Sequence, residues 1–163
     1  GAVVTLTPVG LPEDEPMMKR FHGTLSEESV YFRYLAPLSL EQRTTHARLA
    51  RICFIDYARE VALVAVRETP GRGSEILGVA RLCRETEPTE AEFALVIADR
   101  WQRRGLGACL LRKLVQVARD ERLARIRGVI HGENQAMRQL CQRVGFELAP
   151  VAEGPEWEAS LVP

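Results

Sequence analysis

The sequence predicts a mixed α/β fold in which one sheet, mostly antiparallel, is flanked by helices. Short apolar runs bounded by glycine and proline indicate strands, and two stretches with apolar residues at i and i+4 indicate amphipathic helices. The two kinds of segment follow one another in the order β-α-α-α-β-β-β-α-β-α-β-β. A chain of 163 residues suits one domain, so we expect residues 1–163 to form a single unit.

The first third of the chain predicts a strand followed by three helices. Residues 2–7 form a short β-type run. A first helix is expected to begin near Pro12, because acidic residues fill what would be its first turn. Ser26 and Ser39 are suited to cap a second and a third helix, and the apolar positions of the third continue as far as Ile52.

The middle of the chain predicts an antiparallel meander. Residues 61–66 and 76–82 are apolar runs separated by Pro70-Gly71-Arg72-Gly73, which is a turn signal. A third apolar run covers residues 93–98. Two strands joined by a short glycine-containing turn and followed by another strand are typical of a meander.

The last third begins with a long amphipathic helix. Leu106, Leu110, Leu114 and Ala118 recur every four residues, so they share one face of a helix. The segments that follow are a strand, a helix that Gly145 would end, and two strands that could close as a hairpin. They cover residues 125–130, 136–144, 146–151 and 157–162.

The charge balance excludes several classes of partner. Twenty-two Lys and Arg residues match 22 Asp and Glu residues, so no net charge attracts nucleic acid or an anionic membrane. No apolar run approaches the roughly 18 residues needed to span a bilayer. The first 30 residues also lack the basic-then-apolar layout of an export signal. We therefore expect a cytoplasmic protein with no nucleic-acid or membrane partner.

The cysteines and histidines are too scattered to predict a metal site. Cys53, Cys83, Cys109 and Cys141 are 26–32 residues apart, and no two of them have the close spacing found in zinc sites. Each cysteine lies in an apolar stretch. We therefore expect buried, reduced thiols and no bound metal.

The chemically informative segment is a glycine turn, Gln102–Gly107, between a predicted strand and the long helix. A dinucleotide fingerprint would need glycine where the chain has Leu110, and a P-loop would need Lys and Ser or Thr after Gly107. A helix start offers unpaired N–H groups, glycine lets the backbone approach an anion, and Arg103 and Arg104 add positive charge. These features favour a phosphate or pyrophosphate site over the alternative, a tight strand-to-helix turn.

Two motifs resemble those of the GNAT N-acetyltransferase superfamily. Gln102–Gly107 matches the signature Q/R-x-x-G-x-G/A, and Asn134-Gln135-Ala136-Met137 followed by Val144-Gly145-Phe146 matches N-x-x-A…G-F. A narrower resemblance, over almost the whole chain, is to the GNAT domain of Pat-type bacterial protein lysine acetyltransferases. The segments that carry it are Pro12-Glu13-Asp14, Leu25-Ser26-Glu27-Glu28-Ser29-Val30-Tyr31, Ile52-Cys53-Phe54-Ile55-Asp56-Tyr57 and Glu92-Phe93-Ala94.

The resemblance implies a GNAT-type sheet and acetyl-CoA as co-substrate. Main-chain amides of the glycine turn would bind the diphosphate, and the strand before the turn would pair its backbone with the pantetheine arm. Asn134 would contact the pantetheine or adenosine side, although it is equally suited to cap a helix. The cofactor-binding residues expected on this basis are Leu95, Val96, Ile97, Gln102, Arg103, Arg104, Gly105, Leu106, Gly107, Ala108 and Asn134.

Acetyl transfer to a lysine needs a base, because an amine with a pKa of about 10.4 is protonated at neutral pH. The resemblance assigns this role to Glu92, whose alternative is a solvated strand-end carboxylate. Glu90 is a second candidate and Glu87 a weaker one. Many relatives place Tyr four residues before the Gly-Phe pair as an acid. Cys141 stands there instead, and we expect it to pack in the core, with its use as an acid left open. We expect His131 to be structural.

Taken together, these features predict an enzyme that transfers acetyl directly to an amine in a ternary complex. The resemblance favours a protein lysine, for example that of an acyl-CoA synthetase. The alternatives are a small-molecule amine or amino-acid acetyltransferase and a non-catalytic acetyl-CoA sensor. We expect residues 1–58 to form the acceptor side, 59–150 the cofactor-binding core and 151–163 a C-terminal strand. A bulky residue at Gly107 is expected to abolish cofactor binding with little loss of fold.

Overall fold

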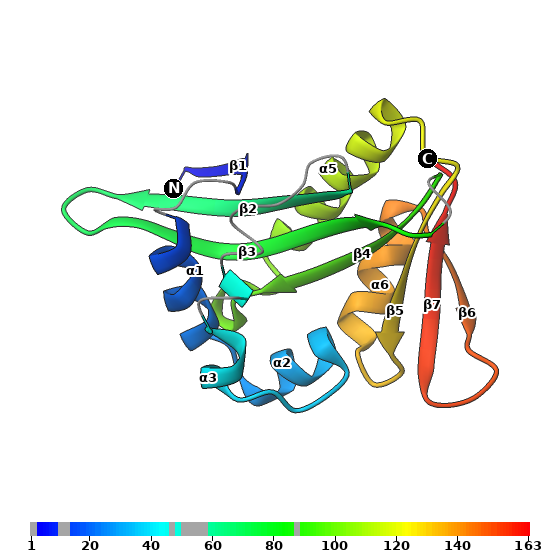
Figure 1. Cartoon of the computed structure of the whole chain (residues 1–163), viewed down its shortest axis with the longest axis horizontal. Helices are drawn as coiled ribbons and strands as arrows, with labels where there is room; N and C mark the ends of the chain where they lie inside the picture. The colour runs from blue at the N-terminus through cyan, green and yellow to red at the C-terminus, as the bar shows by residue number, and fades with distance from the viewer. Residues whose placement is uncertain (1–2, 10–13, 46–47, 50–58, 87–88) are drawn as a thin grey trace.

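The computed structural model describes residues 3–9, 14–45, 48–49, 59–86 and 89–163. Within them, seven strands form one sheet in the order β1-β2-β3-β4-β5-β7-β6 (Figure 1). Neighbouring strands are antiparallel except β4 and β5, which are parallel, so the predicted mixed and mostly antiparallel sheet is confirmed. The strands are β1 (Val4–Pro8), β2 (Glu60–Thr69), β3 (Gly73–Arg84), β4 (Glu90–Ile97), β5 (Arg125–His131), β6 (Glu147–Pro150) and β7 (Glu156–Leu161).

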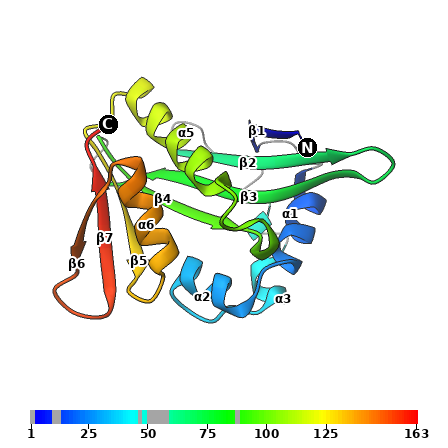
Figure 2. The ribbon, with the colours of Figure 1, turned by 180° about the vertical axis from the view of Figure 1, so that it is seen from behind.

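Helices cover both faces of the sheet (Figures 1 and 2). Two helices, α5 and α6, pack on one face, while α1, α2 and α3 lie on the other. No helix within the described ranges combines the length and the apolar character that crossing a bilayer requires. The helices are α1 (Asp14–Gly23), α2 (Glu27–Tyr34), α3 (Leu40–Arg43), α5 (Leu106–Asp120) and α6 (Gln135–Val144), and a single 3-10 turn, η1 (Asp99–Trp101), precedes α5.

The predicted caps of the second and third helices are confirmed. The hydroxyl of Ser26 accepts a hydrogen bond from the Ser29 amide at 3.1 Å, and so begins α2. Ser39 and Gln42 form a capping box at the start of α3. These bonds use amides that the first turn of a helix cannot pair internally, so the helix starts could be predicted from the serines.

The third helix is shorter than predicted. α3 ends at Arg43, although the apolar pattern predicted a helix as far as Ile52. The physical reason is Thr44, whose φ of −109° departs from helical geometry. The Leu40 carbonyl accepts from both the amide and the hydroxyl of Thr44, at 3.0 and 2.8 Å, and a side-chain bond of this kind competes with continuation of the helix. Of the predicted continuation to Ile52, residues 48–49 are helical, and residues 46–47 and 50–52 lie outside the described residues.

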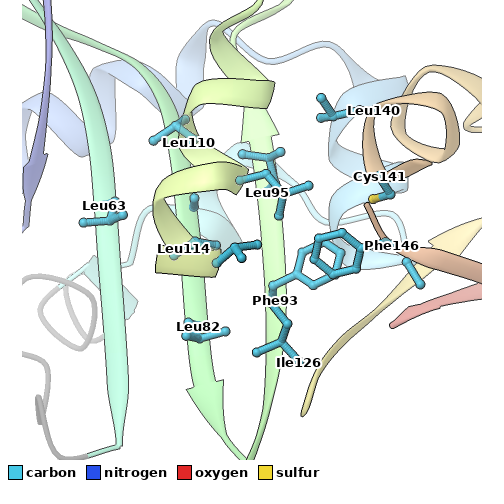
Figure 3. Packing of buried hydrophobic residues seen from close by; sticks show 14 of the residues in the cluster. Leu63, Leu82, Phe93, Leu95, Leu110, Leu114, Ile126, Leu140, Cys141 and Phe146 are labelled. Atoms are coloured by element: carbon cyan, nitrogen blue, oxygen red, sulfur yellow. The ribbon is translucent and has the colours of Figure 1, made fainter. Parts of the chain in front are cut away.

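The main core lies beneath α5 and α6 (Figure 3). Leu110 and Leu114 of α5 are fully buried over β3 and β4, as the predicted four-residue spacing requires. The rings of Phe93 and Phe146 meet edge to face, with centroids 5.0 Å apart. Burying one leucine side chain contributes about 1.5–3 kcal/mol. The apolar stripe of α5 contains several buried residues, so its burial stabilises the helix more than a single cap would. A second cluster packs α1 on the opposite face, with Met18 and Phe21 at its centre.

The parallel strands β4 and β5 separate soon after they meet. They pair only where Glu90–Glu92 lies against Arg125–Arg127. Beyond that point β4 continues to Ile97 with β3 as its only partner in the sheet. The Phe93 ring lies at the separation, so close to Gly128 that a Cβ there would stand 2.6 Å from it. The gap between the two strands positions the site described below.

The cysteine prediction is only partly correct. Cys83, Cys109 and Cys141 are free thiols, as expected, but only Cys141 is buried. Cys83 is half-buried, and Cys109 is exposed because it lies on the outer side of α5, one position before buried Leu110. Cys53 lies outside the described residues. No cluster of three or more potential metal ligands occurs in the described parts of the chain.

Candidate active site

A cavity of about 570 Å³ lies where β4 and β5 separate. The exposed edge of β4 forms one wall, the starts of α5 and α6 form a second, and α2 forms a third. The residues from Phe93 to Ile97 line it, together with Val129 and Ile130 of β5. The cavity therefore joins three regions that the sequence had assigned to separate functions.

The edge of β4 presents main-chain groups to this cavity. The Ala98 amide donates to the Leu77 carbonyl of β3 at 2.8 Å. Because main-chain direction alternates along a strand, Val96 also points its amide and carbonyl toward β3, whereas Leu95 and Ile97 point theirs toward the cavity. The carbonyl of Ile97 accepts a bond from the Gln102 side chain at 3.0 Å. Of the three residues predicted to offer main-chain atoms, Leu95 is therefore the best placed, whereas the amide and carbonyl of Val96 point away from the cavity.

The glycine turn leads from η1 into the start of α5. Gly105 occupies the N-cap position with φ +86°, and no side chain caps the helix. Arg103 is also left-handed, with φ +61°, a conformation that costs a non-glycine residue about 1 kcal/mol. Gly105, Gly107 and Ala108 line the cavity, so the uncapped helix start borders it. This arrangement of free amides and positive helix dipole is suited to an anion.

The two arginines of the turn point in different directions. Arg103 lines the cavity, but the Arg104 guanidinium stacks on the Trp101 ring, 4.9 Å from its centroid. Arg67 stacks on the same ring at the same distance. The Leu106 side chain packs against the core. Among the turn residues predicted to bind the cofactor, the structure thus places Arg104 and Leu106 outside the cavity wall.

Gly107 has a packing role as well as a place in the cavity. A Cβ at this position would lie 3.0 Å from the Leu140 side chain of α6. A Cβ at this position requires the Leu140 side chain to shift by a few tenths of an ångström, and a long side chain would press further on α6. The expectation that a bulky residue here costs little of the fold stays a prediction, and the contact with Leu140 predicts some loss of stability.

Asn134 caps α6, as predicted, and it also lines the cavity, while its contact with the cofactor stays a prediction. Its side-chain oxygen accepts from the Met137 amide at 3.2 Å, which caps α6, and the residue also lines the cavity. His131 at the end of β5 is buried, and its Nδ1 accepts from the Glu133 amide at 3.1 Å. The rings of Tyr31 and Phe32 of α2 pack against it at 5.4 and 5.6 Å. These contacts agree with the structural role expected for His131.

Cys141 lies in the core rather than in the cavity. Its side chain is fully buried beside Phe146 and Leu140 (Figure 3). Burial raises the pKa of this thiol to about 12. The expected packing role is confirmed, and a buried thiol with so high a pKa is a poor proton donor to a group in the cavity.

Glu92 is the carboxylate of β4 that lines the cavity. It is exposed, and the part of the chain that the structure describes offers it no ion-pair partner within 4 Å. Three glutamates around this part of the sheet do form ion pairs, at 2.6–3.0 Å. These pairs are Glu60 with Arg81, Glu85 with Arg127, and Glu158 with Arg125. The Glu92 carboxylate therefore remains available to a ligand, whereas these three glutamates are held in ion pairs with arginines.

The other candidate bases are less well placed. Glu90 is half-buried and does not line the cavity, and Glu87 lies outside the described residues. Two cavity residues beside Glu92 were not predicted, Arg33 and Tyr34 of α2. Arg33 stacks over the Tyr34 ring at 4.8 Å. Burial lowers the pKa of the Arg33 guanidinium, although the nearby Tyr34, Cys83 and Glu92 act in the opposite direction.

Sequence reasoning missed these α2 residues because no local pattern connects them to the glycine turn. The signal available was the resemblance over residues 25–31, which ends two residues before Arg33. Only packing against β4 brings α2 to the cavity. The acceptor-side residues therefore depend on tertiary contacts.

Comparison with known proteins agrees with this geometry. A family model described as an acetyltransferase (GNAT) domain matches residues 4–147. The chain is 34% identical over 134 residues to Acetyltransferase PA5475 of Pseudomonas aeruginosa, which covers 82% of this chain and 70% of that protein. It is 30% identical over 141 residues to Acetyltransferase Pat of Mycolicibacterium smegmatis, covering 86% of this chain and 40% of that protein.

Solved structures show the same fold. The GNAT domain of S. lividans PAT matches with a TM-score of 0.85 and 24% identity, over 98% of this chain and 90% of that one. The PaiA N-acetyltransferase of Thermoplasma acidophilum, solved in complex with coenzyme A, matches with a TM-score of 0.71 and 13% identity over 99% of both chains. With the family match over residues 4–147 and the two sequence relatives, these likenesses lead to one conclusion: the chain belongs to the GNAT acetyltransferase family.

Proposed function

We propose that this protein transfers an acetyl group from acetyl-CoA directly to an amine, and that the amine is a protein lysine. The observation that carries the proposal is one cavity that connects the uncapped start of α5, the free edge of β4 and the Glu92 carboxylate, which forms no ion pair with the described residues. A coenzyme A complex of a fold neighbour and the family membership support acetyl-CoA as the donor.

The residues suited to hold acetyl-CoA follow the cavity wall. The amides around Gly105 and Ala108, with Arg103 beside them, would bind the diphosphate. The pantetheine arm would lie along β4, where Leu95 offers its main chain. An N–H from this edge would donate to the thioester oxygen as negative charge develops there. The side chain of Glu92 would then lie near the carbon that is attacked.

Glu92 is proposed as the base in this reaction. Directly or through a water, its carboxylate would take the proton that the ammonium must lose before nitrogen can attack the thioester carbon. Because no described arginine forms an ion pair with it within 4 Å, the Glu92 carboxylate can also attract the positive charge of the incoming amine. The departing thiolate is a tolerable leaving group, so the reaction does not require the buried thiol of Cys141 as an acid.

The resemblance of the sequence to Pat-type protein lysine acetyltransferases favours a protein lysine as the acceptor, with an acyl-CoA synthetase as one such protein, and the similarity to proteins named Pat supports that resemblance. The test is incubation with labelled acetyl-CoA and a purified acyl-CoA synthetase, beside a version whose active-site lysine is replaced by arginine. We expect label on the first protein only, located by mass spectrometry. Label on polyamines or amino acids but on no protein would favour a small-molecule acetyltransferase, and coenzyme A binding without any transfer would favour a sensor.

A further inference from the structure

A network of hydrogen bonds ties the start of α2 to the cofactor end of the cavity. The Asp99 carboxylate of η1 accepts from the Ser26 amide at 2.9 Å, from the Ser26 hydroxyl at 2.7 Å and from the Ser29 hydroxyl at 3.1 Å. The Gln102 side-chain amide donates to the Ser29 hydroxyl and to the Ile97 carbonyl, both at 3.0 Å. These five residues join segments that lie about 70 residues apart in the chain.

The Ser29 hydroxyl both donates and accepts a hydrogen bond in this network. Ser29 is only 9% exposed, and its oxygen donates one proton to Asp99 while it accepts one from Gln102. Partial burial acts to raise the pKa of the Asp99 carboxyl, but the bonds from Ser26 and Ser29 outweigh it and lower that pKa. Asp99 therefore stays ionised, and charge-assisted bonds of this kind are stronger than neutral ones.

The network connects two parts of the cavity, with Gln102 at one end and Ser29 at the other. Gln102 directly precedes left-handed Arg103 and the uncapped start of α5, where a diphosphate would bind. Ser29 lies in the first turn of α2, whose later residues Arg33 and Tyr34 line the cavity with Glu92. If the glycine turn becomes more rigid, the Gln102 side chain is held more firmly, and its bond to Ser29 then restrains the position of α2.

We propose that Gln102, Ser29 and Asp99 are positioning residues that couple occupation of the glycine turn to the placement of α2 over the acceptor end of the cavity. The inference rests on the proposed function, because it assumes that coenzyme A binds at the turn. Ordering of the turn holds Gln102 against Ser29 and so restrains α2. By reciprocity, the factor by which bound coenzyme A favours the restrained position of α2 equals the factor by which a restrained α2 raises the affinity for coenzyme A.

The test is hydrogen exchange of the full chain, with and without saturating coenzyme A. In the wild type we expect the amides of α2 to exchange about tenfold more slowly when coenzyme A is bound. In Ser29→Ala, and separately in Gln102→Ala, we expect coenzyme A to protect the glycine turn but no longer α2. A purely structural role for these side chains would change exchange in the free protein without removing the response to the ligand.

Ser26→Ala is the matched control. It removes a hydroxyl one helical turn away, which weakens the cap of α2 and its contact with Asp99 but leaves the bond between Gln102 and Ser29 in place. We expect faster exchange in α2 of this variant, with the protection by coenzyme A retained. Loss of the protection in Ser26→Ala to the same degree as in Ser29→Ala would overturn the inference.

Affinity gives a second measurement. By calorimetry we expect Ser29→Ala and Gln102→Ala each to weaken coenzyme A binding about tenfold, the same factor as the protection of α2, and the double variant to be no weaker than either one. Additive losses, or protection of α2 that persists in the single variants, would overturn the inference alone. Absence of coenzyme A binding by the wild type would instead overturn the proposed function, so the two failures can be told apart.

Discussion

The two ends of the cavity are built from different parts of the chain. The end proposed to bind the cofactor consists largely of main chain, namely the free edge of β4 and the uncapped turn before α5. The end proposed to bind the acceptor presents side chains, with Glu92 from β4 and Arg33 and Tyr34 from α2. A main-chain site depends on local backbone geometry, so a short motif encodes it. A side-chain site depends on how distant elements pack, so its residues can change while the fold remains.

Substitution of Glu92 is expected to separate the two ends of the cavity most clearly, because it should change turnover but not cofactor affinity. In Glu92→Gln we expect kcat to fall about 10²- to 10⁴-fold, because the amide cannot accept the proton of the ammonium. The affinity for coenzyme A should not change, since the cofactor end is untouched. Steady-state kinetics and calorimetry measure the two quantities. Glu90→Gln is the control, two residues earlier on the same strand but outside the cavity wall. Equal turnover in wild type and Glu92→Gln would remove this residue from the mechanism.

At the cofactor end the largest effect is expected for Gly107→Arg. The new side chain would enter the cavity and press on Leu140, so we expect binding of coenzyme A to weaken about 100-fold or more, which corresponds to ~2.7 kcal/mol. Overpacking between α5 and α6 should also lower the free energy of unfolding by about 1–3 kcal/mol. Calorimetry and urea unfolding measure these changes.

Gly23→Arg is the control for this substitution, because a Cβ there meets nothing within 4 Å and the residue lies at the end of α1. We expect normal binding and stability. Normal affinity in Gly107→Arg itself would refute the assignment of the turn to the diphosphate.

The helix layer on the acceptor side should lose stability in acid because of His22. Burial, with Arg43, Arg33 and Arg48 nearby, lowers the pKa of this histidine from 6.5 to about 4. Below pH 6.5 the unfolded chain binds a proton that the folded protein excludes, so stability falls as the pH drops from 6.5 toward 4. The loss is about 3 kcal/mol at most. It should level off below pH 4.

The measurement compares urea unfolding of the wild type and His22→Gln at pH 7, 5.5 and 4. The free energy of unfolding of the variant should rise relative to that of the wild type as the pH falls, because glutamine does not titrate. The effects of the carboxylates are common to both proteins and cancel in the difference. A difference that stays constant across this range would contradict the predicted burial of a neutral His22.

The smallest effects are expected for the two arginines of the turn. Arg103→Ala should weaken coenzyme A binding about fivefold, and increasingly so at low salt, because Arg103 lines the cavity. Arg104→Ala should change affinity less than about twofold but lower stability by about 0.5–1 kcal/mol, because Arg104 stacks on Trp101. Titrations at two salt concentrations separate the outcomes, and equal losses of affinity would show that both arginines reach the ligand.

Local patterns predicted much of this fold and some of its site. The meander from residue 61 to 98, the helix from Leu106 and the stop at Gly145 follow from apolar period and glycine, which act over a few residues. The exposure of Cys109 could not be predicted from an apolar stretch alone. It depends on which side of α5 meets the sheet.

The sequence by itself determined the order of strands and helices, the glycine turn and the uncapped start of α5, because backbone conformation responds to neighbouring residues. Only the tertiary structure decided that Arg103 lines the cavity while Arg104 stacks on Trp101, and that the Gln102 side chain bonds to α2. It also decided that Glu92, unlike Glu85, forms no ion pair with the residues that the structure describes. Each of these depends on side chains from segments far apart in the chain, whose meeting no local interaction specifies.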